Sequence, residues 1–266
     1  MDADIYTQVK ASIKRRLQID LENYKAEQMK RRLDSWLART HTATWNDYFN
    51  LLSIDSTELE RFRDYLTINV TEFLRDPNRW ATLKENVLPY LLQHSNGVHH
   101  RTGGLRLWSA GCSVGAEAYT LAMMMAESAP SHKYSLLATD LDRGALLKAK
   151  SGGPYTPEDV RNLDAKQRRK YLTPAPPYFV GEELQKHIRF EEHDLLADRF
   201  EDGFDLIVCR NVVIYFTAEA KETLYAKFSA ALRPGGVLFL GGTEIISGSA
   251  KYGFQNFGVS FYRKVQ

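Results

Sequence analysis

Cysteine is scarce in this chain of 266 residues, which contains only Cys112 and Cys209. Two cysteines are too few for a disulfide framework or a cysteine-based zinc site, and no metal site is predicted. No run approaches the roughly 18 apolar residues that a membrane-spanning helix needs. The start, Met1-Asp2-Ala3-Asp4, lacks the basic-then-apolar pattern of an export signal. We therefore expect a cytoplasmic protein without membrane insertion.

A large excess of charge of either sign is also absent. The 35 basic and 33 acidic residues leave a formal net charge of +2, so a basic surface for a partner must be local. No nucleic-acid partner is expected. The chain is 44% hydrophobic and 26% charged, which is typical of a globular protein with room for one large domain and one small domain.

Residues 1–94 have the apolar spacing of helices and predict a small all-helical N-terminal domain. Two stripes of apolar residues show this spacing. The first recurs every fourth residue and comprises Ile5, Val9, Ile13 and Leu17. The second comprises Met29, Leu33, Trp36 and Leu37. Thr44 with Asp47, and Asp55 with Glu58, have the spacing of helix caps. The polar stretch from His94 to Gly104 is typical of a linker.

Residues 95–266 alternate strands with helices, which predicts an α/β domain built on a doubly wound parallel sheet. The expected strands are Leu105–Trp108, Tyr134–Ala138, His187–Phe190, Phe204–Cys209 and Val237–Leu240. The aromatic tail from Phe254 to Tyr262 is expected to add antiparallel edge strands. Residues 170–189, which contain three prolines, interrupt the alternation and predict a small β-subdomain. Ligands of such sheets bind at the carboxyl ends of the strands.

A glycine-bearing turn follows the first predicted strand, at Gly111-Cys112-Ser113-Val114-Gly115. Glycine lets the backbone approach a cofactor closely, but this loop lacks the full dinucleotide-binding pattern. Asp140 favours the interpretation of this loop as a cofactor site. It ends the next predicted strand, where a doubly wound fold places an acid that accepts hydrogen bonds from two ribose hydroxyls. The alternative is a tight turn in which Asp140 caps the next helix.

Polar side chains also follow the later strands. Asp194 and Leu195 come after the third strand, where the acid would accept from an adenine amino group, although a solvated loop acid is the alternative. Arg210 and Asn211 end the fourth strand, and such groups are costly there unless a ligand or partner meets them. Tyr215 could lie against a sulfonium cation or simply pack in the core.

A further polar cluster, comprising Asn69, Thr71 and Arg75, ends the helical region. Taken alone, Arg75 could be a surface charge that pairs with Glu72 or Asp76. Together with the strand-end motifs, however, this cluster resembles the CheR-type chemotaxis receptor methyltransferases. The matching strings are Thr67–Arg75, the Gly-Cys-Ser-Val-Gly loop, Ala138–Asp142, His193–Leu196 and Cys209–Phe216.

The resemblance covers essentially the whole chain and implies a Rossmann-like class I methyltransferase domain that uses S-adenosyl-L-methionine and releases S-adenosyl-L-homocysteine. It implies that the cofactor is surrounded by Asn69, Thr71, Arg75, Glu117, Asp140, Asp194, Leu195, Arg210 and Asn211. Arg75 and Tyr215 are implied as the catalytic residues, near the transferred methyl. The family usually has Gly-Glu-Glu-Pro-Tyr where this chain has Gly115-Ala116-Glu117-Ala118-Tyr119, a departure that bears on Glu117.

The implied activity is glutamate O-methylation of the cytoplasmic helical domain of chemotaxis receptors during sensory adaptation. Glutamate, with a pKa of roughly 4.3, is already a nucleophile near neutral pH, so no general base is required. One alternative is methylation of amide nitrogen or nucleic acid. Its Asn/Asp-Pro-Pro-Tyr motif would follow the fourth strand, whereas Pro176-Pro177-Tyr178 precedes the third. A second alternative is a non-catalytic cofactor sensor or docking module.

A basic stripe follows the second apolar stripe, with Lys25, Arg32 and Arg39 spaced by seven and Arg31 beside them. We expect these residues to bind the glutamate-rich receptor helices, although a solvated helix face is the simpler interpretation. The resemblance also implies that family members docking on a receptor-tail pentapeptide do so through an extended β-subdomain loop. Here the stretch is short and contains three prolines, which lack backbone donors. We therefore predict the pentapeptide-independent subtype.

Overall fold

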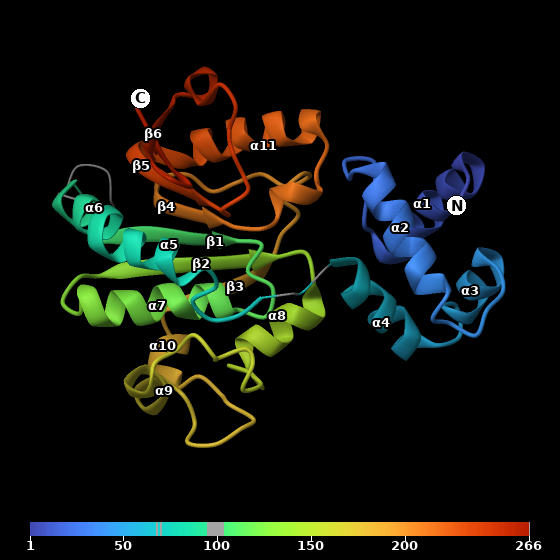
Figure 1. Ribbon diagram of the computed structural model, residues 1–266, viewed down its shortest axis with the longest axis horizontal. Helices are drawn as coiled ribbons and strands as arrows, with labels where there is room; N and C mark the ends of the chain where they lie inside the picture. Colours follow the sequence, from blue (N-terminus) through green and yellow to red (C-terminus); the bar gives the residue numbers. More distant parts are fainter. Residues whose placement is uncertain (68, 70, 95–103, 266) are drawn as a thin grey trace. The chain divides into compact units, whose positions relative to one another are not determined.

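A computed structural model describes residues 1–67, 69, 71–94 and 104–265 of the chain. Contacts divide it into two compact units, and Figure 1 labels most of their helices and strands. Unit 1 comprises Met1–Ile68 and Ile214–Glu222, and unit 2 comprises Asn69–Val213 and Thr223–Gln266. In the described ranges, no helix is both long enough and apolar enough to cross a membrane.

Unit 1 is built on four helices, α1 (Ala3–Leu17), α2 (Ala26–Leu37), α3 (Trp45–Leu51) and α4 (Ser56–Thr67). Their apolar stripes meet in a core where Ile13, Leu33 and Phe62 have no exposed surface. Ile5, which the spacing assigned to the first stripe, is 40% exposed instead. Thr44 accepts a hydrogen bond from the backbone N–H of Asp47 at 3.2 Å, as the cap spacing predicted.

The helical pattern beyond residue 68 belongs to unit 2. It forms α5 (Pro77–Thr82), the π-helix η1 (Leu83–Val87) and α6 (Leu88–His94). Trp80 and Val87 are buried in one apolar cluster with Leu107 and Val237 of the sheet. The domain boundary predicted at residue 94 therefore differs from the division by contacts, because helical spacing does not reveal which core an apolar face joins. The predicted linker lies outside the described residues, apart from His94 and Gly104.

Unit 2 contains a seven-stranded sheet in the order β3-β2-β1-β4-β5-β7-β6. Its strands are β1 (Leu105–Ala110), β2 (Tyr134–Asp140), β3 (Ile188–Glu192), β4 (Phe204–Cys209), β5 (Leu232–Leu240), β6 (Phe254–Gly258) and β7 (Phe261–Lys264). The first five pair in parallel and the last two antiparallel, which confirms the predicted sheet and edge. The strand predicted at Val237–Leu240 begins earlier in the structure, at Leu232, and its pairing with β4 shifts register between Phe204 and Leu206.

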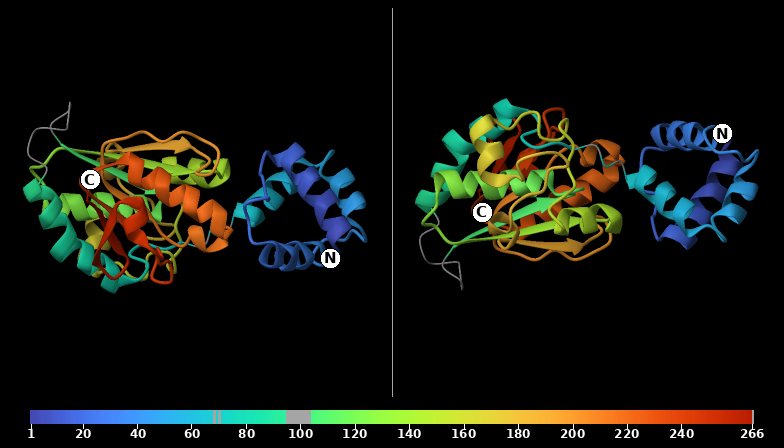
Figure 2. Two further views of the ribbon diagram at one scale, coloured as in Figure 1. Left: turned by 90° about the horizontal axis from the view of Figure 1, so that it is seen from above. Right: turned by 90° about the horizontal axis from the view of Figure 1, so that it is seen from below.

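Helices cover both faces of this sheet (Figure 2). The helices α7 (Ala116–Ser128) and α8 (Arg143–Lys150) lie on the same face as α5 and α6, and their buried residues belong to the same apolar cluster. The helix α11 (Ala218–Ala231) begins in unit 1 and ends in unit 2, where its Phe228 packs edge-on against Trp108 of β1. Burial on both faces explains why β4 and the second half of β5, near the middle of the sheet, are continuously buried.

The segment between β2 and β3 carries α9 (Ala165–Tyr171) and α10 (Glu182–Gln185). The β-subdomain predicted at residues 170–189 is reduced here to isolated antiparallel bridges, Leu172 with Val180 and Tyr178 with Tyr155. Proline lacks the N–H that a continuous ladder requires, so the proline cluster limits pairing to these positions.

Candidate active site

The loop after β1 brings backbone to the carboxyl edge of the sheet. Gly111 has φ +84°, and a Cβ added there would stand 2.6 Å from a methyl group of Val212. Glycine is required at such a position, because other residues are strained at this φ and the added atom would clash. The N–H groups of Gly111 and Cys112 donate to the carbonyl of Thr139, at 2.8 and 2.9 Å. These bonds join the loop to the end of β2.

Asp140 ends β2 beside that loop. One carboxylate oxygen accepts from the N–H of Ser113 at 2.7 Å, and the other accepts from the N–H of Asp142 at 2.9 Å. Each oxygen retains acceptor capacity for a hydroxyl group. Burial raises the pKa of this carboxyl to about 6, although the two N–H bonds oppose the shift. The carboxylate is therefore held in place for a ligand that offers two donors.

The side chain of Asn69 forms hydrogen bonds with two residues that also contact Asp140, namely Ser113 and Asp142. Its side-chain oxygen accepts from the hydroxyl of Ser113 at 2.9 Å, and its nitrogen donates to Asp142 at 2.5 Å. The cluster at the end of the predicted helical region is thus brought to the glycine loop. Thr71, two residues later, is half-buried in the same unit.

Asp194 and Leu195 follow β3 and reach the same edge. The N–H of His193 donates to the carbonyl of Asp140 at 3.0 Å, which joins the two strand ends. One oxygen of Asp194 accepts from the N–H groups of Leu196 and Ala197, so this acid stabilises its own loop. Contact of Asp194 with an adenine stays a prediction.

Arg210 follows β4 and is almost fully buried. Its guanidinium pairs with Asp76 at 2.6 Å and lies 5.4 and 4.9 Å from the ring centroids of Trp80 and Phe239. Burial lowers its pKa, and Glu117 is the largest opposing influence. Glu117 accepts from the hydroxyl of Ser109 at 2.7 Å, and burial raises its pKa to about 7. Both predicted residues therefore belong to one buried polar cluster.

Asn211 adopts a left-handed conformation with φ 60°. Glu244 secures this turn by accepting from the N–H of Asn211 at 2.9 Å and from that of Gly241 at 2.6 Å. Within the described part of the chain, the side-chain oxygen of Asn211 and Nε of Arg210 are buried without a hydrogen-bond partner. Buried polar groups are rarely left unsatisfied, so these atoms indicate a ligand at the end of β4.

Arg75 lines a cavity of about 490 Å³ next to these groups. The lining residues are Arg75, Asp76, Pro77, Asn78, Arg79, Asn211, Gly242 and Thr243. Glu72 and Asp76, the partners suggested by sequence proximity, pair with Arg161 and Arg210 respectively. Arg75 and Asn211 therefore line the same cavity.

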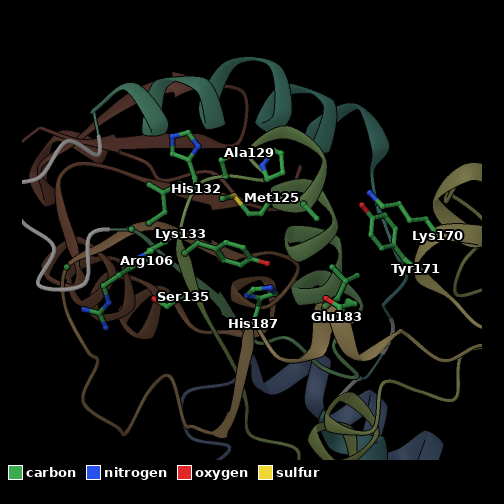
Figure 3. A pocket seen from close by; sticks show the side chains of 18 of the residues that line it. Arg106, Met125, Ala129, His132, Lys133, Ser135, Lys170, Tyr171, Glu183 and His187 are labelled. Carbon is green, nitrogen blue, oxygen red and sulfur yellow. The ribbon is translucent and has the colours of Figure 1, made fainter.

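A larger cavity of about 1120 Å³ lies elsewhere in unit 2 (Figure 3). It is lined by Leu105 and Tyr134, the first residues of β1 and β2, together with His132, Lys133 and His187. Ligands of doubly wound sheets bind at the carboxyl ends of the strands, which is the opposite edge. None of the predicted site residues lines this cavity.

Tyr215 and the basic stripe belong to unit 1. The carbonyl of Tyr215 accepts from the N–H of Lys25 at 2.9 Å. Lys25, Arg31 and Arg39 are exposed. Arg32 is half-buried instead: its guanidinium donates to the carbonyl of Tyr65 and stacks 4.5 Å from the centroid of that ring. Arg32 therefore helps to pack α2 against α4, and the exposed stripe is Lys25, Arg31 and Arg39.

Four residues that hold the site together were missing from the sequence prediction, namely Asp76, Ser113, Asp142 and Glu244. Ser113 and Asp142 lie inside motifs that resemble the family, so the sequence did indicate that they lie near the site. Glu244 follows β5 by four residues, and an acid shortly after a strand end could have suggested it. Asp76 had no such signal, because its partner Arg210 is 134 residues away.

A doubly wound sheet with an antiparallel last strand, an acid after β2 and unsatisfied polar atoms after β4 define an S-adenosylmethionine-dependent methyltransferase of the Rossmann-like class. Residues 69–262 match the model of the CheR methyltransferase SAM binding domain, and residues 4–67 match that of the CheR methyltransferase all-alpha domain. The chain belongs to the CheR methyltransferase family. Its cofactor is S-adenosylmethionine, for which Asp140, Asn211 and the Gly111 loop provide a fitting donor and acceptor set.

Proteins named chemotaxis protein methyltransferase are similar to this chain along most of its length. The chain is 45% identical over 253 residues to that of Listeria innocua, covering 95% of this chain and 94% of the relative. The protein from Listeria monocytogenes has the same identity and coverage. The Escherichia coli protein is 31% identical over 254 residues, covering 91% of this chain and 84% of the relative.

Proposed function

We propose that this chain methylates glutamate side-chain carboxylates on the cytoplasmic helical domain of chemotaxis receptors, acting in the cytoplasm. The observation that carries the proposal is the charge of the cavity beside the cofactor residues. Arg75 and Arg79 line it, and its one lining carboxylate, Asp76, is already paired with Arg210. A cavity with this lining favours an anionic acceptor, such as a carboxylate, over a neutral amide nitrogen.

The chemistry requires positioning rather than proton transfer. Bound S-adenosylmethionine supplies an electrophilic methyl group on a sulfonium. Glutamate is ionised at neutral pH, since its ordinary pKa is roughly 4.3. We propose that Asp140, Asn69 and Asn211 hold the cofactor, and that Arg75 orients the incoming carboxylate. Such alignment contributes up to about 7–11 kcal/mol in favourable systems. Tyr215 is proposed to lie beside the transferred methyl.

Peptide mass spectrometry tests the proposal. The full chain is incubated with S-adenosylmethionine and a helical receptor fragment, and each modified residue is located. Methyl groups are expected on glutamate. Methylation confined to asparagine, glutamine or lysine would contradict the proposed acceptor, and a folded, cofactor-binding chain that modifies nothing would favour a sensor or docking module.

The exposed stripe is proposed to recruit the receptor. We expect the double substitution Arg31→Glu and Arg39→Glu to weaken fragment binding by about tenfold at low salt, because two attractions become repulsions. The loss should shrink as salt screens the charges over ~8 Å at physiological ionic strength. Calorimetry measures both effects. Arg15→Glu reverses an exposed charge on α1 and is the matched control. Equal binding by the wild type, the double variant and this control would show that the stripe is only a solvent-exposed helix face.

Docking on a receptor-tail pentapeptide is proposed to be absent. A docked strand needs free backbone donors, yet those of residues 178–181 bond within the chain, to Tyr155, Thr173, Gly152 and Tyr171 in turn. Receptor fragments with and without their last residues should therefore be methylated at equal rates. Calorimetry with a free tail peptide should give no heat. Micromolar binding that disappears when residues 179–181 are altered would overturn this proposal.

A further inference from the structure

Arg79 is a half-buried arginine whose charge has no partner in the described part of the chain. Its backbone is engaged in α5, where its N–H donates to the carbonyl of Asp76 at 2.9 Å. Its guanidinium, however, makes no hydrogen bond, ion pair or ring contact with a described residue. Arg161 and Arg210 of the same unit, in contrast, pair with Glu72 and Asp76 respectively. Partial burial without a counter-ion is costly, which points to an external anion.

The surroundings of Arg79 suit a carboxylate. Asn78 and Thr243 line the same cavity, and both offer uncharged donors. One oxygen of Asp76 is held by Arg210 at 2.6 Å, and no ion pair joins Asp76 to Arg79 in the described part of the chain. The planar guanidinium presents a fork of donors that matches the two oxygens of a carboxylate. The cavity is therefore equipped to bind one carboxylate at a place distinct from the ribose acceptor Asp140.

We infer that Arg79, with Asn78 and Thr243, forms a carboxylate-binding subsite that recognises the protein substrate. The inference rests on the proposed function, since it assumes an acidic helical acceptor. Arg79 then determines specificity, whereas the cofactor is held by other residues. Two kinds of substrate carboxylate fit this subsite: the carboxylate that is methylated, and the carboxylate of a neighbouring acidic residue.

The test compares Arg79→Gln, Arg79→Lys and the control Lys84→Gln. Lys84 lies five residues further on, carries the same charge and pairs with Glu127 outside the cavity. We expect Arg79→Gln to raise KM for the receptor fragment about tenfold or more, as for loss of a charge-assisted hydrogen bond. Arg79→Lys should recover part of the loss because it keeps the charge without the fork. The Kd for S-adenosylhomocysteine should not change in any variant.

Binding of unreacted fragments shows which of the two carboxylates, the acceptor or a neighbouring acid, occupies the subsite. This measurement does not depend on catalysis. The wild type and Arg79→Gln are titrated with fragments that carry glutamate or glutamine at the acceptor positions. If the wild type prefers glutamate and Arg79→Gln does not, the subsite holds the acceptor carboxylate. If both prefer glutamate equally but Arg79→Gln binds every fragment more weakly, the subsite holds a neighbouring acid. Either result supports the inference.

Two results would overturn the inference. Weaker binding of S-adenosylhomocysteine by Arg79→Gln would assign Arg79 to the carboxylate of the cofactor. Unchanged fragment binding and unchanged KM, with Lys84→Gln behaving alike, would leave Arg79 without a role in recognition. Failure of the proposed function itself is recognisable separately, because the wild-type protein would then transfer no methyl group to glutamate.

Discussion

Replacing Asp140 with alanine is expected to raise the Kd for S-adenosylhomocysteine about a hundredfold. The carboxylate is fixed by the N–H groups of Ser113 and Asp142, and both of its oxygens retain acceptor capacity. Charge-assisted hydrogen bonds contribute about 1.5–3 kcal/mol each, and two such bonds to one carboxylate are not fully additive. Isothermal titration calorimetry measures the change. Asp202→Ala, which removes an exposed acid of the same unit, should bind as the wild type does.

The pH dependence of binding gives this prediction a second signature. Burial raises the pKa of Asp140 to about 6, so its carboxylate form predominates above that pH and is lost as pH falls through it. Protonation turns one acceptor into a donor. Affinity of the wild type should therefore fall below about pH 6, and that of Asp140→Ala should not show this step. Wild-type affinity in the folded Asp140→Ala variant would remove Asp140 from the cofactor site.

Replacing Asp76 with asparagine is expected to lower the free energy of unfolding by about 2–3 kcal/mol. The guanidinium of Arg210 is 2% exposed, so removal of its partner leaves a buried charge with less compensation. The usual cost of 3–5 kcal/mol for a buried pair is reduced here because Asp76 is 50% exposed and water can approach. Asparagine tolerates the left-handed conformation that residue 76 adopts, with φ 59°. Urea unfolding measures the loss.

The double variant Asp76→Asn with Arg210→Met separates the cost of an unpaired buried charge from the contribution of side-chain packing. Methionine keeps much of the apolar contact with Trp80 and Phe239 but carries no charge that needs a partner. The double variant should therefore be more stable than Asp76→Asn alone. If Asp76→Asn unfolds at the wild-type urea concentration, the ion pair makes no net contribution and Arg210 is stabilised chiefly by the two rings.

The carboxyl edge of the sheet was predictable because parallel strands end at the same edge. Gly111, Asp140 and Asn211 each follow an apolar strand in the sequence, so their convergence needs only the doubly wound topology. The interior of the site was less predictable. Glu244 and Asp76 act through partners on distant segments, and nothing in their local spacing shows which backbone N–H or guanidinium they meet.

Two predictions depended on patterns that leave the packing partner open. The apolar face around Trp80 has the same helical spacing whether it joins a helical domain or a sheet, and it joins the sheet core. Arg32 follows the seven-residue spacing of the basic stripe, yet its guanidinium stacks on Tyr65. Long side chains combine an apolar stem with a charged end, so spacing alone does not separate a packing arginine from an exposed one.

The most direct test of receptor glutamate methylation is the alkaline release of methyl label. The chain is incubated with methyl-labelled S-adenosylmethionine and a helical receptor fragment, and the modified fragment is then treated with base. Carboxyl methyl esters hydrolyse in base, so we predict that the label is released as volatile methanol, and that a fragment with glutamine at the acceptor positions takes up no label. Label that stays on the fragment after base treatment would show methylation of nitrogen and contradict the proposed reaction.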